Sequence, residues 1–214
     1  MSLALFFMMQ LATACLLFLW RPVAAQSRRI SLFASAIMVI WASTIIARCG
    51  DGEVLVHTFD KWAATFGIVF VVARLGSLFI LLQALLLFVT LVALRPESHG
   101  ETTLTRAHPV LMVATFGLFG AFMTGDLFSL FVMVELVLVS SYMLIQMPGT
   151  RRSLVAAIPM IGINTVASAL FICGLGLLYG IGGSLNISDL IGHIGEVPGG
   201  LRLAALVMLV AAFA

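Results

Sequence analysis

The sequence predicts an all-α integral membrane protein with six transmembrane helices and a truncated seventh. Its 214 residues are 62% hydrophobic and only 9% charged, against roughly 45–50% and 25% in soluble domains. The apolar residues also fall into long blocks without charge, and about 20 of them are enough to cross the hydrocarbon core of a bilayer. This composition excludes a disordered chain, which requires low hydrophobicity, and argues against a water-soluble enzyme.

The charged and sulfur-containing residues indicate no soluble binding chemistry. The net charge is +2, and the 11 cations are scattered among the polar breaks, so no nucleic-acid partner is predicted. The three cysteines (Cys15, Cys49 and Cys173) form no CxxC pair, and the four histidines show no HxxxH spacing. The sequence therefore predicts no disulfide framework, no metal site and no cofactor.

The first three spans are separated by basic and proline-containing breaks. Leu3–Trp20 is followed by Arg-Pro, and it is interpreted as a retained helix because it lacks a basic segment before it. Ile30–Ala47 is the second span. The stretch 66–72 is short and rich in β-branched residues, so we expect an extended re-entry segment before a helix over 74–94. Arg95-Pro96 ends that helix.

The next two helices flank a tight turn. A polar loop over Glu97–His108 is expected to precede a span over Pro109–Thr124, since proline is favoured in the first turn of a helix. Asp126 follows and is positioned to cap the fifth span, Leu127–Ile145.

The sixth helix and the chain end complete the series of elements. Leu154–Tyr179 is the sixth span, and Gly180–Gly200 is expected to form a glycine-rich loop. Leu201–Ala214 is apolar but has only 14 residues, which is too short to cross a bilayer. We therefore expect this chain to be a fragment of a longer protein.

Arginine and lysine are unequally divided between the two sets of alternating loops. Cytoplasmic loops carry the excess of these residues in membrane proteins. The loops after the first, third and fifth spans hold seven cations against three in the other set, which predicts an N-terminus outside the cell. The seven are Arg21, Arg28, Arg29, Arg95, Arg106, Arg151 and Arg152, and the three are Arg48, Lys61 and Arg202.

Glu135 is the most informative candidate for function. It lies in the middle of the fifth span with only apolar residues one turn away on either side. A carboxylate at this depth costs at least a few kcal/mol if it stays charged and unpaired. It must therefore take a proton, find a cation or face water, which are the requirements of a proton relay. The alternative is a protonated Glu135 that only hydrogen-bonds a neighbouring helix.

Three further polar residues have two interpretations each. Asp126 either only caps its helix or also marks a proton entrance. Arg74 either extends to the membrane interface or pairs with a buried acid. Asn164 shares a helix face with Ser168, four residues later, and this pair either joins helices by hydrogen bonds or lines a file of water.

One stretch of the sequence is similar to a known family. The block from Thr124 to Leu136 (TGDLFSLFVMVEL), followed by SSYML from Ser140, resembles the fifth helix of antiporter-like subunits. Multisubunit Mrp-type Na+/H+ antiporters and respiratory complex I share these subunits. Phe66-Gly-Ile-Val, His108-Pro109 and the loop segment from Gly183 to Leu190 resemble the branch formed by the Mrp D subunits.

This resemblance implies a fold and a function beyond what composition shows. The chain would be the first part of a fourteen-helix subunit with inverted repeats, with N-terminal helices over residues 1–108 and the start of the first repeat over 109–214. It implies a bacterial-type plasma membrane, other antiporter subunits and lipid as partners, and protons and Na+ as the transported ions. In the family, the glutamate matching Glu135 pairs with a lysine of the seventh helix, beyond this chain's expected end.

Two alternatives to the antiporter function stay open at this point. The first is a proton-pumping subunit of complex I or of a membrane-bound hydrogenase, driven by redox partners. The second is an inactive truncated scaffold. In the leading interpretation the protein is not an enzyme, because protons move through Glu135 without covalent chemistry.

Overall fold

The computed structural model describes residues 3–20, 22–59, 68–94, 101–193, 195 and 198–211 of the chain. Six helices in these ranges are long and apolar enough to cross a membrane, which confirms the predicted all-α membrane fold. They are α1 (Leu3–Trp20), α2 (Ala24–Gly50), α3 (Arg74–Ala93), α5 (Glu101–Met123), α6 (Leu127–Gln146) and α7 (Arg151–Gly182). Two shorter helices follow, α8 (Ile187–His193) and α9 (Gly199–Ala211).

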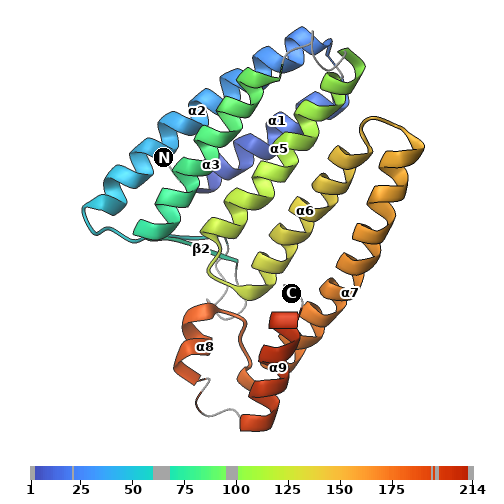
Figure 1. Ribbon diagram of the computed structural model, residues 1–214. Coiled ribbons are helices and arrows are strands. Elements are labelled where there is room, and N and C mark those ends of the chain that lie inside the picture. Colours follow the sequence, from blue (N-terminus) through green and yellow to red (C-terminus); the bar gives the residue numbers. More distant parts are fainter. Residues whose placement is uncertain are drawn as a thin grey trace.

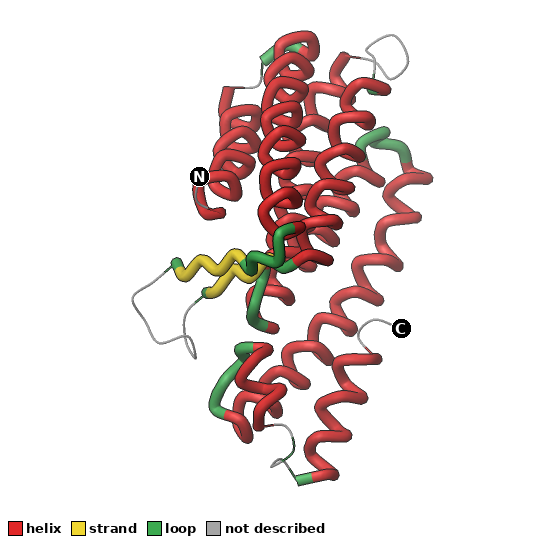
Figure 2. The backbone as a smooth tube through the Cα atoms, turned by 90° about the vertical axis from the view of Figure 1, so that its left-hand side faces the viewer, coloured by secondary structure: helices red, strands yellow, loops and turns green. Residues whose placement is uncertain are grey.

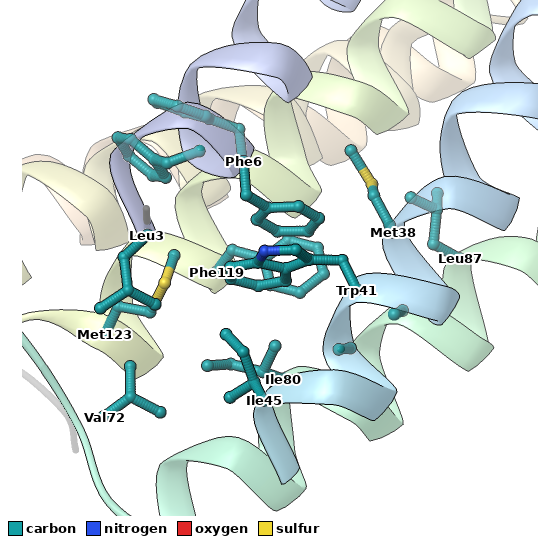
Figure 3. Close-up of a cluster of buried hydrophobic side chains, with 14 of the residues drawn as sticks. Leu3, Phe6, Met38, Trp41, Ile45, Val72, Ile80, Leu87, Phe119 and Met123 are labelled. Atoms are coloured by element: carbon teal, nitrogen blue, oxygen red, sulfur yellow. The ribbon is translucent and has the colours of Figure 1, made fainter. Parts of the chain in front are cut away.

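Helices α1, α2, α3 and α5 pack side by side and form what we call the N-terminal bundle (Figure 1). Its centre is aromatic: the ring of Phe6 stacks on Trp41 at a centroid distance of 3.6 Å and meets Phe119 edge-on at 5.5 Å. Met38, Ile80 and several other apolar side chains surround these rings (Figure 3). The bundle is therefore closed at mid-height by well-packed apolar groups.

A two-stranded antiparallel hairpin lies at one end of the bundle (Figure 2). Strand β1 (Leu55–Thr58) pairs with β2 (Val69–Val72), with Leu55 opposite Val72. The extended conformation predicted for 66–72 is thus confirmed over β2, while residues 66 and 67 lie outside the described residues. The sequence did not predict β1, which is too short to show a clear alternation.

The fourth span is longer than predicted. Helix α5 begins at Glu101 rather than Pro109, so the polar loop expected up to His108 is wrong from residue 101 onward. Proline removes only its own N–H bond and displaces the carbonyl four residues before it, and the preceding turns still pack their apolar side. Leu104, Ala107 and His108 are all buried against the bundle.

The predicted loop over Gly180–Gly200 is also wrong in part. Helix α7 continues to Gly182 and ends at Gly183, whose φ of 64° is the left-handed conformation that glycine adopts at little cost. Helices α8 and the start of α9 then lie within the remaining segment. Helix α9 packs on α7 where Gly174 has no side chain to keep the two apart.

Helices α6 and α7 extend the structure sideways from the bundle, in the order α5, α6, α7 (Figure 1). The α5–α6 contact is close because Gly117 and Gly120 of α5 face Met133 of α6. Much of α7 exposes apolar side chains such as Ile163 and Val166, as expected of a surface in contact with lipid or further protein.

Candidate functional site

The start of α6 is held by backbone pairing on two sides. The Gly125 N–H donates to the Val69 carbonyl of β2 at 2.7 Å, and the Leu127 N–H donates to Leu185 at 3.0 Å. Asp126 caps the helix, because its Oδ1 accepts a hydrogen bond from the Ser129 N–H at 2.6 Å, as the sequence predicted. Its side chain is buried, and the loop after α7 therefore covers the entry to α6.

Glu135 lies nine residues into α6, about 13 Å along the helix. Its side chain is half-buried and points toward α7, where the Ser168 hydroxyl contacts its Oε1 within hydrogen-bond distance. The same hydroxyl lies 2.8 Å from the backbone carbonyl of Asn164, one turn earlier in α7. The serine oxygen thus has two oxygen neighbours and only one proton to donate.

A hollow of about 200 Å³ opens beside Glu135 between α6 and α7. Its polar groups come from Glu135, Asn164 and Ser168, and the rest of its lining is apolar. This volume has room for several water molecules, each of which takes about 30 Å³ in the liquid. The apolar lining consists of Phe131, Val134, Leu138, Ala167 and Phe171.

Asn164 reaches both the hollow and the neighbouring helix. Its side-chain amide donates to the hydroxyl of Tyr142 on α6, so the interpretation that it joins helices is confirmed, and it also lines the hollow. Tyr142 was not predicted as a site residue. Its spacing of seven residues from Glu135, two helical turns on the same face, is the sequence signal that could have revealed it.

Arg74 lies apart from this site. It is the first residue of α3, its side chain is exposed, and it forms no ion pair with Asp126 or Glu135 among the residues that the structure describes. The ion pair found within the described ranges joins Arg48 Nη2 to Glu53 Oε1 at 2.5 Å on the surface. The hydrogen bond from Arg48 lowers the pKa of Glu53. The structure therefore brings Glu135 and Asn164 together, and leaves Asp126 and Arg74 elsewhere.

Comparison with known proteins agrees with this arrangement. The family described as "NADH:quinone oxidoreductase/Mrp antiporter, TM" matches residues 124–214, which include Asp126, Glu135 and Asn164. The D subunit of the Na(+)/H(+) antiporter of Alkalihalophilus pseudofirmus is 34% identical over 185 residues, covering 86% of this chain and 38% of that protein. The chain belongs to the antiporter-like membrane-subunit family. The resemblance to the Mrp D subunits is thereby confirmed.

Other antiporter-like subunits support this placement. The D subunit of the Bacillus subtilis Na(+)/H(+) antiporter is 35% identical over 171 residues, covering 79% of this chain and 34% of that protein. The D subunit of a "probable K(+)/H(+) antiporter" from Rhizobium meliloti is 36% identical over 168 residues, covering 74% and 30%. The chain thus spans between a third and two fifths of the first two relatives.

Solved structures share the fold. A chain of the Mrp complex from Dietzia sp. DQ12-45-1b matches with a TM-score of 0.83 at 26% identity, over 97% of this chain and 39% of that one. A chain of an archaeal membrane-bound sulfane sulfur reductase matches with a TM-score of 0.89 at 20% identity, over 99% and 44%. The second match shows the fold alone, because fold similarity at low identity does not carry function.

Proposed function

We propose that this chain is part of a proton-translocating subunit of a multisubunit Na+/H+ antiporter, in which Glu135 takes up and releases protons in the middle of the membrane. Its position supports this role, because an ionisable residue at that depth is rare and usually functional. The relatives named as D subunits of Na(+)/H(+) antiporters supply the reaction class. Na+ is the proposed exchanged cation, with K+ as the alternative that the Rhizobium relative's name favours.

The observation that carries the proposal is the position of the Ser168 hydroxyl between two acceptors. When Glu135 is ionised, Ser168 can donate its proton to the Glu135 carboxylate. When Glu135 is protonated, its own O–H can donate to the Ser168 oxygen while Ser168 donates to the Asn164 carbonyl. Both protonation states of Glu135 therefore keep a hydrogen bond, which reduces the difference in free energy between them.

The hollow beside Glu135 supports proton supply through water. It adjoins the carboxyl group and contains the polar side chain of Asn164, so water molecules in it can hydrogen-bond to both. In this proposal Asn164 orients water and Tyr142, and Asp126 lies near the end of α6 where protons enter or leave. Arg74 interacts with the membrane interface.

The proposed orientation follows from the two ends of the helices. Arg28, Arg29, Arg106, Arg151 and Arg152 come from the end where α1 leads into α2, α5 begins and α6 leads into α7 (Figure 1). Because positively charged residues favour the cytoplasmic side, we assign this end to the cytoplasm. The N-terminus is then outside, and the hairpin and α8 are outside as well.

The experiment replaces Glu135 by glutamine in the native full-length protein, assembled with its partner subunits. Glutamine keeps the shape and hydrogen bonding but cannot exchange a proton. We expect cation-driven proton exchange in vesicles to be lost while the complex assembles normally. Glu53→Gln is the matched control, since that glutamate is exposed at the surface, and it should retain exchange. Exchange at the unaltered rate in Glu135→Gln would overturn the proposal.

A further inference from the structure

A second group of buried polar side chains lies inside the N-terminal bundle, away from Glu135. Four of its polar atoms are buried without a hydrogen-bond partner in the part of the chain that the structure describes: Gln10 Oε1, Arg28 Nε, Ser31 Oγ and His108 Nε2. The residues Gln10, Ser31 and His108 are completely buried. An unsatisfied buried polar atom costs about 1–3 kcal/mol, so this group calls for a missing partner.

The four atoms belong to neighbouring residues on three helices. Gln10 of α1 donates through Nε2 to the Met112 carbonyl of α5 at 3.3 Å, and His108 lies one helical turn before Met112. Arg28 and Ser31 are three residues apart on α2 and therefore adjacent on its surface. The Arg28 guanidinium acts electrostatically on the His108 ring. The unpartnered atoms thus line one short polar path through the interior of the bundle.

Existing hydrogen bonds determine which of these atoms accept. His108 Nδ1 lies 2.6 Å from the Leu104 carbonyl. A carbonyl can only accept, so Nδ1 carries the proton and Nε2 is an acceptor in the neutral ring. The Gln10 amide nitrogen must likewise face the Met112 carbonyl, which makes Oε1 the free acceptor.

The other two atoms can donate. Arg28 donates through Nη2 to the Val92 carbonyl of α3 at 3.2 Å, and its Nε–H remains a donor. The Ser31 hydroxyl can both donate and accept. The site therefore presents two acceptors, one donor and one group of either kind.

This combination selects a neutral occupant. An anion would face the lone pairs of Gln10 Oε1 and His108 Nε2, and a cation would face the positive charge of Arg28. Water both donates and accepts and matches the four atoms. We propose that bound water bridges Gln10, Arg28, Ser31 and His108 and joins α1, α2 and α5 inside the membrane.

The waters would have one side of access. One turn beyond Gln10 and Thr115, the bundle is filled by the Phe6, Trp41 and Phe119 rings (Figure 3). Arg28, by contrast, is only partly buried and lies near the start of α2. Water would therefore enter from the arginine-bearing end and stop below the aromatic rings.

The first test uses the sign of a stability change. Ser31→Ala is made in the native full-length protein within its complex, with Ser35→Ala as the matched control. Ser35 is equally buried, on the same face of α2, but its hydroxyl donates to its own helix at the Leu32 carbonyl. If water bridges the site, Ser31→Ala removes one of its ligands, and the apparent Tm should fall about 2–4 °C below that of Ser35→Ala.

An empty site gives the opposite result. Without water, Ser31→Ala removes an unsatisfied hydroxyl, and its apparent Tm should equal or exceed that of Ser35→Ala, which would overturn the proposal. A map of the complex at a resolution that shows water is the second measurement. Density within hydrogen-bond distance of two or more of the four atoms supports the bridge. Direct contacts among them with no density between, or density for a larger ion, overturn it.

Discussion

Gly117 offers a direct test of how tightly α5 must pack against α6. A Cβ atom at this position would lie 2.7 Å from the Met133 carbonyl oxygen and 2.9 Å from Val137 Cγ2. The first obstacle is backbone and cannot rotate away. To reach an ordinary contact of 3.4 Å, the two helices must separate by about 0.7 Å (3.4 minus 2.7) at this point. We therefore expect Gly117→Ala to weaken the α5–α6 contact.

The magnitude follows from comparison with a glycine in open space. Overpacking a well-packed contact costs about 1–3 kcal/mol. Alanine also favours a helix over glycine by about 1 kcal/mol, and this gain must be removed by a control. Gly162→Ala on α7 provides it, because nothing lies within 4 Å of a Cβ there. At about 2–4 °C per kcal/mol, Gly117→Ala should melt roughly 2–12 °C below Gly162→Ala.

The assay is thermal unfolding of both variants in the native complex, with exchange activity measured in parallel. Met133 and Val137 lie two residues on either side of Glu135, so a displacement of this segment changes the position of Glu135 against Ser168. Activity should therefore fall together with stability in Gly117→Ala and stay unchanged in Gly162→Ala. Equal melting temperatures of the two variants would refute this account of the packing.

Two further substitutions test the hydrogen bonds of the site and of the surface. Ser168→Ala removes the hydroxyl that serves both protonation states of Glu135, and exchange should slow about tenfold or more, since hydrogen bonds to charged groups contribute about 1.5–3 kcal/mol; an unchanged initial rate of exchange would contradict this. Arg48 lowers the pKa of Glu53 below 4.5, so the pair stabilises the fold above pH 4.5 and loses this effect as pH falls through the lowered value. Arg48→Ala should move the carboxylate titration, followed by infrared spectroscopy, back toward 4.5, and an unmoved midpoint would show that the pair does not form.

The membrane-spanning helices could be predicted because the bilayer imposes a simple rule. Backbone polar groups in lipid must be satisfied within the segment, so a charge-free apolar block such as Leu3–Trp20 becomes one helix with the expected bounds. Pro109 misled the prediction because a proline that can begin a helix can also lie inside one. Only the burial of Leu104 and His108 against other helices, a tertiary effect, keeps the preceding turns helical.

The site could be predicted in part for a similar reason. The depth of Glu135 and the shared face of Asn164 and Ser168 depend on one helix each, and the sequence contains this information. That Ser168 contacts Glu135, and that Asn164 contacts Tyr142, depends on how α6 and α7 align. Single-helix periodicity does not determine that alignment. The pairing of β1 with β2 was missed for the same reason.

The α5–α6 contact also separates the two polar sites. At Gly117 and Gly120, α6 approaches α5 so closely that even a methyl group would collide with it, and no water molecule fits there. Glu135 faces the hollow on the α7 side, whereas Gln10 and His108 lie on the bundle side of α5. A proton moves between sites only along hydrogen-bonded groups or water, so this dry contact blocks passage from Glu135 into the N-terminal bundle at this level. The two glycines therefore serve proton insulation as well as packing.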